Sequence, residues 1–307
     1  MTLVITTCTN RKRKPVPDSL HVSSLPKAEI ADLASDWARC LADAPMRFQA
    51  SEIYGGRGFQ EAIAAAALLD ARLMIVSAGL GLIFASERVP AYACTVLVDA
   101  EDSIGARALG GFNIRGWWKV LTDVSPFSRS LPEIASEQDG LICAALSDNY
   151  IDMIADDLVN LPDEIRGRLR LFTRAPLDRV VAPLRRFVMP YDDRLDGPDS
   201  PIRGTRSDFA GRAVRHFAGL VGAEAGSASA SDHAEAITAA MAGWRLPPRV
   251  DRIRHDDAAL LDLMRTHWEA ENGSSSRLLR HFRDELGIAC EQSRFAGLAR
   301  IVRSERA

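Results

Sequence analysis

The fold is decided by the first expected strand and the loop after it, Thr2–Lys14, TLVITTCTNRKRK. The run Val4–Thr7 is typical of a buried strand, and the residues after it change to small polar and basic types. In open α/β sheets, ligands bind beyond the carboxyl ends of the strands. The alternative is a solvated connection whose basic run has no function. The candidate substrate-binding residues of this loop are Cys8, Thr9, Asn10 and Arg11.

Length and composition limit the classes of protein that the chain can form. A chain of 307 residues predicts two domains, or one α/β domain with a helical appendage. The net charge of -3 predicts no global attraction to nucleic acid, so any such surface must be local. Five scattered cysteines predict neither a zinc site nor a disulfide framework, and we expect no metal and no cofactor. No apolar run approaches the roughly 20 residues that span a bilayer, so we expect a cytoplasmic protein without a membrane partner.

Strands and helices are expected to alternate through most of the chain. This order favours an α/β fold with a mostly parallel sheet sandwiched by helices. A pair of tryptophans, Trp117 and Trp118, is expected in the core rather than in a ligand platform. The helices are expected at Pro26–Asp43, Gln60–Asp70, Phe112–Val124 and Ile151–Leu161, and the further strands at Leu73–Val76, Thr95–Val98, Leu141–Leu146, Arg170–Thr173 and Phe187–Met189.

Two glycine-rich stretches, SEIYGGRGF at Ser51–Phe59 and SAGLGLI at Ser77–Ile83, are expected beside the first loop. A glycine-rich turn that opens a helix can offer N–H groups to a phosphate, because the helix N-terminus is partially positive. Three glycines also serve an ordinary tight turn. The candidates are Tyr54 and Phe59 for stacking on a base, and Gly55, Ser77, Gly79 and Gly81 for the wall of a pocket.

The densest group of charges lies in Phe187–Phe217, FVMPYDDRLDGPDSPIRGTRSDFAGRAVRHF. Thr205 or Ser207 is expected to cap a helix that carries Asp208 and Arg212 on one face. One interpretation is a salt-bridge network that orders a loop. The other is a site in which carboxylates act and arginines hold phosphate. The candidate catalytic carboxylates are Asp192, Asp193 and Asp208, with Glu52 in reserve, and the candidate substrate-binding arginines are Arg203 and Arg206.

A small, flexible stretch, 222–231, is the expected linker between an α/β domain at 1–221 and a helical module at 232–307. Helix, short glycine-containing turn and helix are the form of a helix-turn-helix. Alternatively, these helices pack on the main domain and their arginines are solvated. The expected helices are His233–Trp244, Asp256–Glu271, Arg277–Leu286 and Glu291–Ser304, and the candidate DNA-binding residues are Arg277, Arg280, Arg283 and Arg294.

Three blocks of the first 100 residues carry a family resemblance. They are Thr7–Lys12, Ile53–Gly55 with Phe59, and Ile75–Ile83. This pattern resembles the peroxide-stress and archaeosine-synthase-like superfamily. The resemblance implies a uracil-DNA-glycosylase-like α/β fold, and relatives that occur beside tRNA-guanine transglycosylase domains and in phage-defence contexts.

We therefore expect a hydrolase: a DNA glycosylase that excises a modified or damaged base and leaves an abasic site, with a role in anti-phage defence. Its partner is duplex DNA, from which the target nucleotide is flipped into a pocket. A carboxylate then stabilises the oxocarbenium-like sugar or activates water. Two alternatives remain open. One is a non-catalytic DNA-binding or stress-response protein, and the other is an enzyme that acts on a free nucleotide, a free base or tRNA. The oligomeric state is open as well.

Overall fold

The computed structural model describes residues 1–222, 228–248 and 251–306. Contacts divide the chain into two compact units, Met1–Pro247 and Pro248–Ala307. The domain boundary expected at 222–231 is therefore wrong, although its residues 223–227 lie outside the described part. Helix α10 (Ala230–Ala240) belongs to the first unit, because Ile237 and the following Met241 are buried in the core that α9 (Phe209–Val221) shares with the sheet.

The first unit is built on a five-stranded sheet of order β4-β3-β1-β6-β7. Four strands are parallel, and β4 pairs antiparallel with β3 at one edge. The expected mostly parallel α/β sheet is confirmed. The strands are β1 (Leu3–Thr7), β3 (Arg72–Ser77), β4 (Gly81–Phe84), β6 (Ile142–Ala145) and β7 (Leu169–Phe172).

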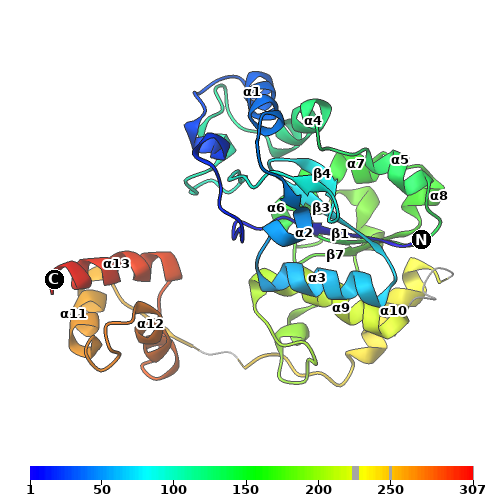
Figure 1. The fold of residues 1–307 in the computed structure, drawn as a ribbon. Helices are drawn as coiled ribbons and strands as arrows, with labels where there is room; N and C mark the ends of the chain where they lie inside the picture. Colours follow the sequence, from blue (N-terminus) through cyan, green and yellow to red (C-terminus); the bar gives the residue numbers. More distant parts are fainter. Residues whose placement is uncertain (223–227, 249–250, 307) are drawn as a thin grey trace. The chain divides into compact units, whose positions relative to one another are not determined.

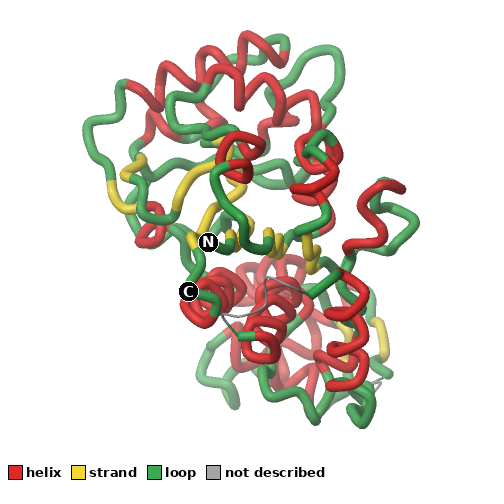
Figure 2. The backbone as a smooth tube through the Cα atoms, turned by 90° about the vertical axis from the view of Figure 1, so that its right-hand side faces the viewer, coloured by secondary structure: helices red, strands yellow, loops and turns green. Residues whose placement is uncertain are grey.

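Helices cover both faces of this sheet, as Figures 1 and 2 show. Along β1, Leu3 and Ile5 contribute to one hydrophobic core and Val4 to the other, because successive strand residues point to opposite faces. The helices α3 (Arg57–Leu68), α9 and α10 cover the Val4 face. The opposite face carries α1 (Ile30–Ala42), α4 (Ile114–Val124), α6 (Asp148–Met153) and α7 (Ala155–Val159). Short elements complete the unit: α2 (Ala50–Ile53), α5 (Leu131–Ser136), α8 (Asp163–Arg166), and the antiparallel pair β2 (Phe48–Gln49) and β5 (Arg88–Val89).

Several expected elements differ from the structure. The strand expected at Thr95–Val98 is wrong: the Thr95 N–H donates to the Asp102 carbonyl, so this segment pairs within its own loop and not with the sheet. At Phe187–Met189 the structure has one isolated bridge, between Val188 and Leu171. The helix expected at Ile151–Leu161 is divided into α6 and α7.

The tryptophan pair lies in the core, as expected. Trp117 is fully buried and donates its Nε1–H to the Ala78 carbonyl at 2.8 Å, while Trp118 donates to Asp157 at 2.7 Å. Both indole N–H groups therefore have partners, which a buried tryptophan needs.

The second unit contains α11 (Asp257–His267), α12 (Ser275–Asp284) and α13 (Gln292–Ser304). Its core is separate from the first unit's cores and includes Leu260, Phe282 and Phe295. The sequence predicted helices alone here, but β8 (Ile253–Arg254) and β9 (Ile288–Ala289) form a short parallel pair.

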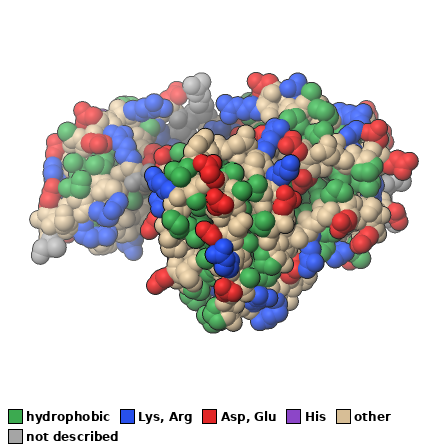
Figure 3. Space-filling view, turned by 90° about the horizontal axis from the view of Figure 1, so that it is seen from above, with side chains coloured by type: hydrophobic (Ala, Val, Ile, Leu, Met, Phe, Trp, Pro, Cys, Tyr) green, Lys and Arg blue, Asp and Glu red, His purple; other side chains and the backbone are tan. Residues whose placement is uncertain are grey.

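Charges of both signs are interspersed on the face shown in Figure 3, as a net charge of -3 suggests. Within residues 1–222, 228–248 and 251–306, no helix combines the length and the apolar character needed to cross a membrane.

Candidate active site

A pocket of about 400 Å³ opens at the carboxyl ends of β1 and β6. Thr7 and Ala145, the last residues of these two strands, form its floor. The chain adds β3 on one side of β1 and later adds β6 on the other, so the strand order reverses between β1 and β6. This reversal is the place where ligands bind in open α/β sheets.

The walls of the pocket come from five segments of the first unit. They are the loop after β1, the start of α3, the start of α6, the start of α9 and the irregular loop near Thr95. The residues beyond the strand ends are Cys8, Thr9, Asn10, Arg11, Gly55, Gly56, Arg57, Gly58, Phe59, Thr95, Leu97, Ser147, Asn149, Tyr150, Ser207, Asp208, Ala210 and Gly211.

Helix α3 begins in the pocket wall without a side-chain cap. Its N-cap residue is Gly56, with a φ of 112° that L residues rarely adopt. Thr9 fixes the preceding turn by donating its hydroxyl to the Gly55 carbonyl at 2.6 Å. The uncapped first turn presents main-chain N–H groups and the positive end of the helix dipole, which suit an anion.

Close packing of α3 on α9 sets one wall. A Cβ atom on Gly211 would clash with the carbonyl of Gly58, so two glycines allow the helices to approach. This approach brings Asp208, at the start of α9, beside the first turn of α3. Sequence and packing together thus place a carboxylate next to the uncapped first turn of α3.

Asp208 is the one predicted catalytic carboxylate that lines the pocket. It is 5% exposed, and its Oδ1 accepts hydrogen bonds from Arg212 Nε at 2.6 Å and from the Thr205 N–H at 2.8 Å. Thr205, one of the two expected caps, forms a capping box with Asp208. Arg57 Nε lies 3.9 Å from Asp208 Oδ2. The carboxylate is therefore fixed between two arginines at the pocket wall.

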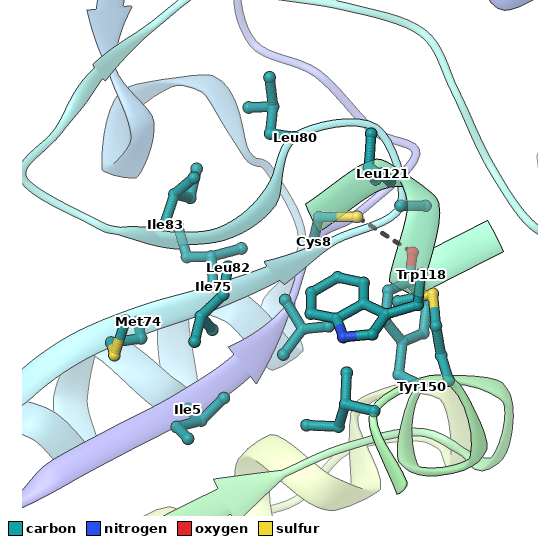
Figure 4. Packing of buried hydrophobic residues seen from close by; sticks show 14 of the residues in the cluster. Ile5, Cys8, Met74, Ile75, Leu80, Leu82, Ile83, Trp118, Leu121 and Tyr150 are labelled. Atoms are coloured by element: carbon teal, nitrogen blue, oxygen red, sulfur yellow. Dashed lines mark hydrogen bonds between the residues drawn. The ribbon is translucent and has the colours of Figure 1, made fainter. Parts of the chain in front are cut away.

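Cys8 and Tyr150 contact each other across the pocket floor. The Cys8 Sγ lies 3.0 Å from the Tyr150 hydroxyl, the contact that is dashed in Figure 4. Burial raises the pKa of Tyr150 well above its usual value, and the nearby Cys8 raises it further. The tyrosine is neutral at physiological pH and can donate its O–H.

A second polar cluster lies directly behind the loop after β1. Lys12 Nζ donates to the Thr9 carbonyl at 2.5 Å and lies 4.7 Å from the centre of the Tyr92 ring and 5.0 Å from that of Tyr54. The Tyr92 hydroxyl lies 2.5 Å from Ser77 Oγ and 3.2 Å from the Tyr54 hydroxyl. Burial lowers the pKa of Lys12 and raises the pKa of both tyrosines.

This cluster sits beside a smaller cavity of about 140 Å³, which shares Asn10 and Thr95 with the main pocket. Lys12, Cys94 and Asp102 also line it. Sequence reasoning placed Lys12 in the loop after the first strand but not among the candidate site residues. It missed Tyr92, which follows the third motif block.

The structure brings some of the predicted substrate-binding residues together. Those that line the pocket are Cys8, Thr9, Asn10, Arg11, Gly55 and Phe59. Tyr54 and Ser77 are fully buried behind the loop and contribute to the Lys12 cluster instead.

Gly79 and Gly81 do not line the pocket, because Ser77–Ile83 is not an open loop: Ser77 ends β3, residues 78–80 form a tight turn, and Gly81 begins β4. A Cβ atom on Gly79 would clash with the Tyr92 ring, and one on Gly81 with Ser128. These glycines serve close packing in the core.

Asp192 and Asp193 lie outside the pocket. Asp192 accepts hydrogen bonds from the N–H and Nε of Arg194, at 2.9 and 3.0 Å, and Asp193 forms an ion pair with Arg174. Together with Arg206 they line a separate hollow of about 540 Å³. Their contacts fit the salt-bridge network that orders this loop.

The remaining predicted residues of the first unit are also outside the pocket. Glu52 pairs with Lys14 at 3.1 Å and is half exposed. Arg203 is exposed on the loop before the Thr205 cap. In the second unit, Arg283 and Arg294 line one hollow, whereas Arg277 and Arg280 are exposed on α12 outside it.

Sequence reasoning missed the contribution of β6. Ser147, Asn149 and Tyr150 follow this buried strand and line the pocket. The same pattern that identified the first loop, a buried strand followed by polar residues, could have found them.

Within the described part of the chain, no three His, Cys, Asp or Glu side chains gather in a group that could hold a metal ion. The structure thus has an α/β fold with a pocket at the reversal of strand order. No family model, no curated protein and no solved structure matches the chain.

Proposed function

We propose that the protein is a DNA glycosylase, which releases a modified or damaged nucleobase from DNA and leaves an abasic site, in defence against phage. The observation that carries this proposal is the pocket between β1 and β6, where an uncapped helix end, exposed arginines and a fixed carboxylate converge. Its volume of about 400 Å³ lies in the range of small-molecule sites and is sufficient for one flipped nucleotide.

The parts of the pocket suit different parts of a nucleotide. The first turn of α3 and the guanidinium groups of Arg11 and Arg57 are donors for phosphate oxygens. The Asn149 amide can form hydrogen bonds with the edge of a base. Phe59 lies behind the wall, because it is only 1% exposed and packs on the Tyr54 ring, so stacking on a base is not part of this proposal.

In this proposal Asp208 acts on the sugar. As the C1′–N bond breaks, the base leaves with the bonding electrons, and the negative carboxylate stabilises the positive charge that develops on the sugar. Water adds to C1′, one of its protons passes to the departing base or to solvent, and the products are free base and abasic DNA. Arg212 and Thr205 hold the carboxylate in position for this role.

The family resemblance supports the same function and the finer description of the fold as uracil-DNA-glycosylase-like. Its three blocks contribute Cys8, Lys12, Tyr54 and Ser77, which are neighbours in or behind the pocket. The short helices of the second unit support a helix-turn-helix-like module for duplex DNA.

One observation favours a second candidate function, that of an enzyme whose substrate is a free nucleotide or a free base. Every residue that lines the pocket belongs to the first unit, so a mononucleotide would find its contacts there. A substrate panel separates the two candidates.

The experiment treats the full chain with duplexes that carry uracil, alkylated bases or hypermodified pyrimidines, and with the matching mononucleotides. We expect alkali-labile DNA and free base from at least one duplex. The variant Asp208→Asn should lose release, while the control Asp192→Asn, in a carboxylate outside the pocket, should retain it. Hydrolysis of mononucleotides without release from any duplex would replace the proposal by the second candidate.

Because Asp208 also holds Arg212, the variant Asn149→Ala provides an independent test. Asn149 lines the pocket on the exposed start of α6, so its loss should leave the fold intact and reduce turnover. Full activity of both Asp208→Asn and Asn149→Ala would move the reaction away from this pocket.

A further inference from the structure

A hollow of about 400 Å³ in the second unit is surrounded by arginines. It lies where β8 and β9 pair, with Arg254 opposite Ala289 in the register. The residues that line it are Arg252, Arg254, Arg283, Ala289, Cys290, Glu291 and Arg294.

Main-chain carbonyls hold three of these arginines in place. Arg252 Nε donates to the Arg283 carbonyl at 3.0 Å, and Arg283 Nη2 donates to the Cys290 carbonyl at 2.9 Å. Arg294 Nη2 donates to the His255 carbonyl at 3.1 Å. A carbonyl orients a guanidinium group but carries no net charge, so these bonds position the positive charges without neutralising them.

Carboxylates offset the charge of only part of the cluster. Arg294 pairs with Asp257 at 2.6 Å, and Arg252 lies 3.6 Å from Asp284. Within the part of the chain that the structure describes, no carboxylate pairs with Arg254 or Arg283. Glu291 lies at the hollow and accepts the Arg294 main-chain N–H at 3.0 Å. The four arginines of the hollow therefore face three carboxylates, Asp257, Asp284 and Glu291, which leaves a net excess of one positive charge.

We propose that this arginine hollow binds a backbone phosphate of nucleic acid. One guanidinium group can form two parallel hydrogen bonds with phosphate oxygens. Several guanidinium groups around one bound anion favour a phosphate over a single carboxylate. Arg277 and Arg280 are exposed on α12, the helix that also carries Arg283, so basic side chains continue along the element beyond the hollow. An extended polyanion can contact such a row of positive side chains along its length. This inference rests on the proposed function as a DNA glycosylase, and it assigns a contact with the DNA backbone to the second unit.

The test measures binding of the full chain to a labelled, unmodified duplex of about 20 base pairs over a range of salt concentrations. Each phosphate contact that is lost lowers the slope of log affinity against log salt by about 0.9. Arg254→Ala should weaken binding by about fivefold at physiological salt and lower the slope by about 0.9. Arg254 is exposed, so its loss should leave the fold intact. Arg254→Lys, which keeps the charge, should recover most of the slope.

A matched control removes the same charge from the same unit. Arg265 lies outside the hollow and pairs with Glu305 and Asp262, so Arg265→Ala should leave the slope unchanged. Arg283→Ala should repeat the effect of Arg254→Ala. An unaltered slope in both hollow variants would overturn the inference, as would a phosphoserine peptide that binds the hollow while the duplex does not.

Base release distinguishes this inference from the proposed function. At saturating duplex, Arg254→Ala should release base at the wild-type rate, because the candidate pocket lies in the other unit. If the wild-type chain releases no base but the salt slopes change as expected, the glycosylase proposal fails and the phosphate site stands.

Discussion

The ammonium group of Lys12 lies 4.7 Å from the centre of the Tyr92 ring and donates a hydrogen bond to the carbonyl of Thr9. A buried aromatic face and one carbonyl replace water only in part, so burial lowers the pKa of Lys12 below its usual 10.5. The residue ties the pocket loop to the core behind it.

This relationship predicts a pH dependence of stability. Below its lowered pKa, Lys12 is protonated in both the folded and the unfolded chain. Between that pKa and 10.5, the unfolded chain keeps a proton that the folded chain has lost, so the contribution of this group to the free energy of unfolding rises with pH. Urea unfolding of both proteins across this pH window measures the effect. As the pH rises, the wild type should gain stability relative to Lys12→Met.

A difference in stability between the wild type and Lys12→Met that stays constant over this pH range would contradict the burial of the Lys12 ammonium group.

The sheet was predictable from local pattern because its strands are buried runs of apolar residues. β1, β3 and β6 carry such runs, which parallel strands covered on both faces require, whereas the buried Arg170 interrupts the run in β7. The segment Thr95–Val98 has the same local composition but leaves Val98 83% exposed. Composition cannot tell whether a neighbouring strand is available to pair with a segment.

The site was predictable only in part, because packing between distant segments decides which polar residues face a pocket. Asp192 and Asp208 lie in one charged stretch, yet only Asp208 is brought against α3 by the close approach of Gly58 and Gly211. Ion pairs across long sequence separations, such as that of Asp193 with Arg174, have no local signature.

The glycines of α9 (Phe209–Val221) should respond oppositely to alanine. A Cβ atom at Gly211 would clash with the main chain of α3, whereas one at Gly219 meets no atom within 4 Å. Gly211→Ala should destabilise the chain by about 1–3 kcal/mol through overpacking. Gly219→Ala should stabilise it by up to about 1 kcal/mol, because alanine favours the helix. Thermal unfolding of the two variants checks this, and equal effects would contradict the packing of α3 on α9.

The carboxylates should differ in their effect on stability. Asp208 pairs with Arg212, whose side chain is fully buried, whereas the Asp193 side chain is 58% exposed. Asp208→Asn should cost about 3 kcal/mol, near the lower end for breaking a buried ion pair, because Arg212 retains its pair with Asp196. Asp193→Asn should cost less than about 1 kcal/mol. Chemical unfolding at neutral pH measures both, and a larger loss for Asp193→Asn would show that burial does not set the strength of these two ion pairs.

The thiol of Cys143 should be protected by the fold. It lies in the centre of β6 and is fully buried, and burial raises its pKa from 9.0 to about 12. The folded chain therefore holds this proton more tightly than the unfolded chain, so the stabilising contribution is complete below pH 9.0 and is lost as the pH rises toward about 12. Alkylation at pH 8 followed by peptide mass analysis should modify the half-buried Cys40 first, and Cys143 only at the rate of unfolding. Modification of Cys143 as fast as Cys40 in the folded chain would contradict its place in the sheet.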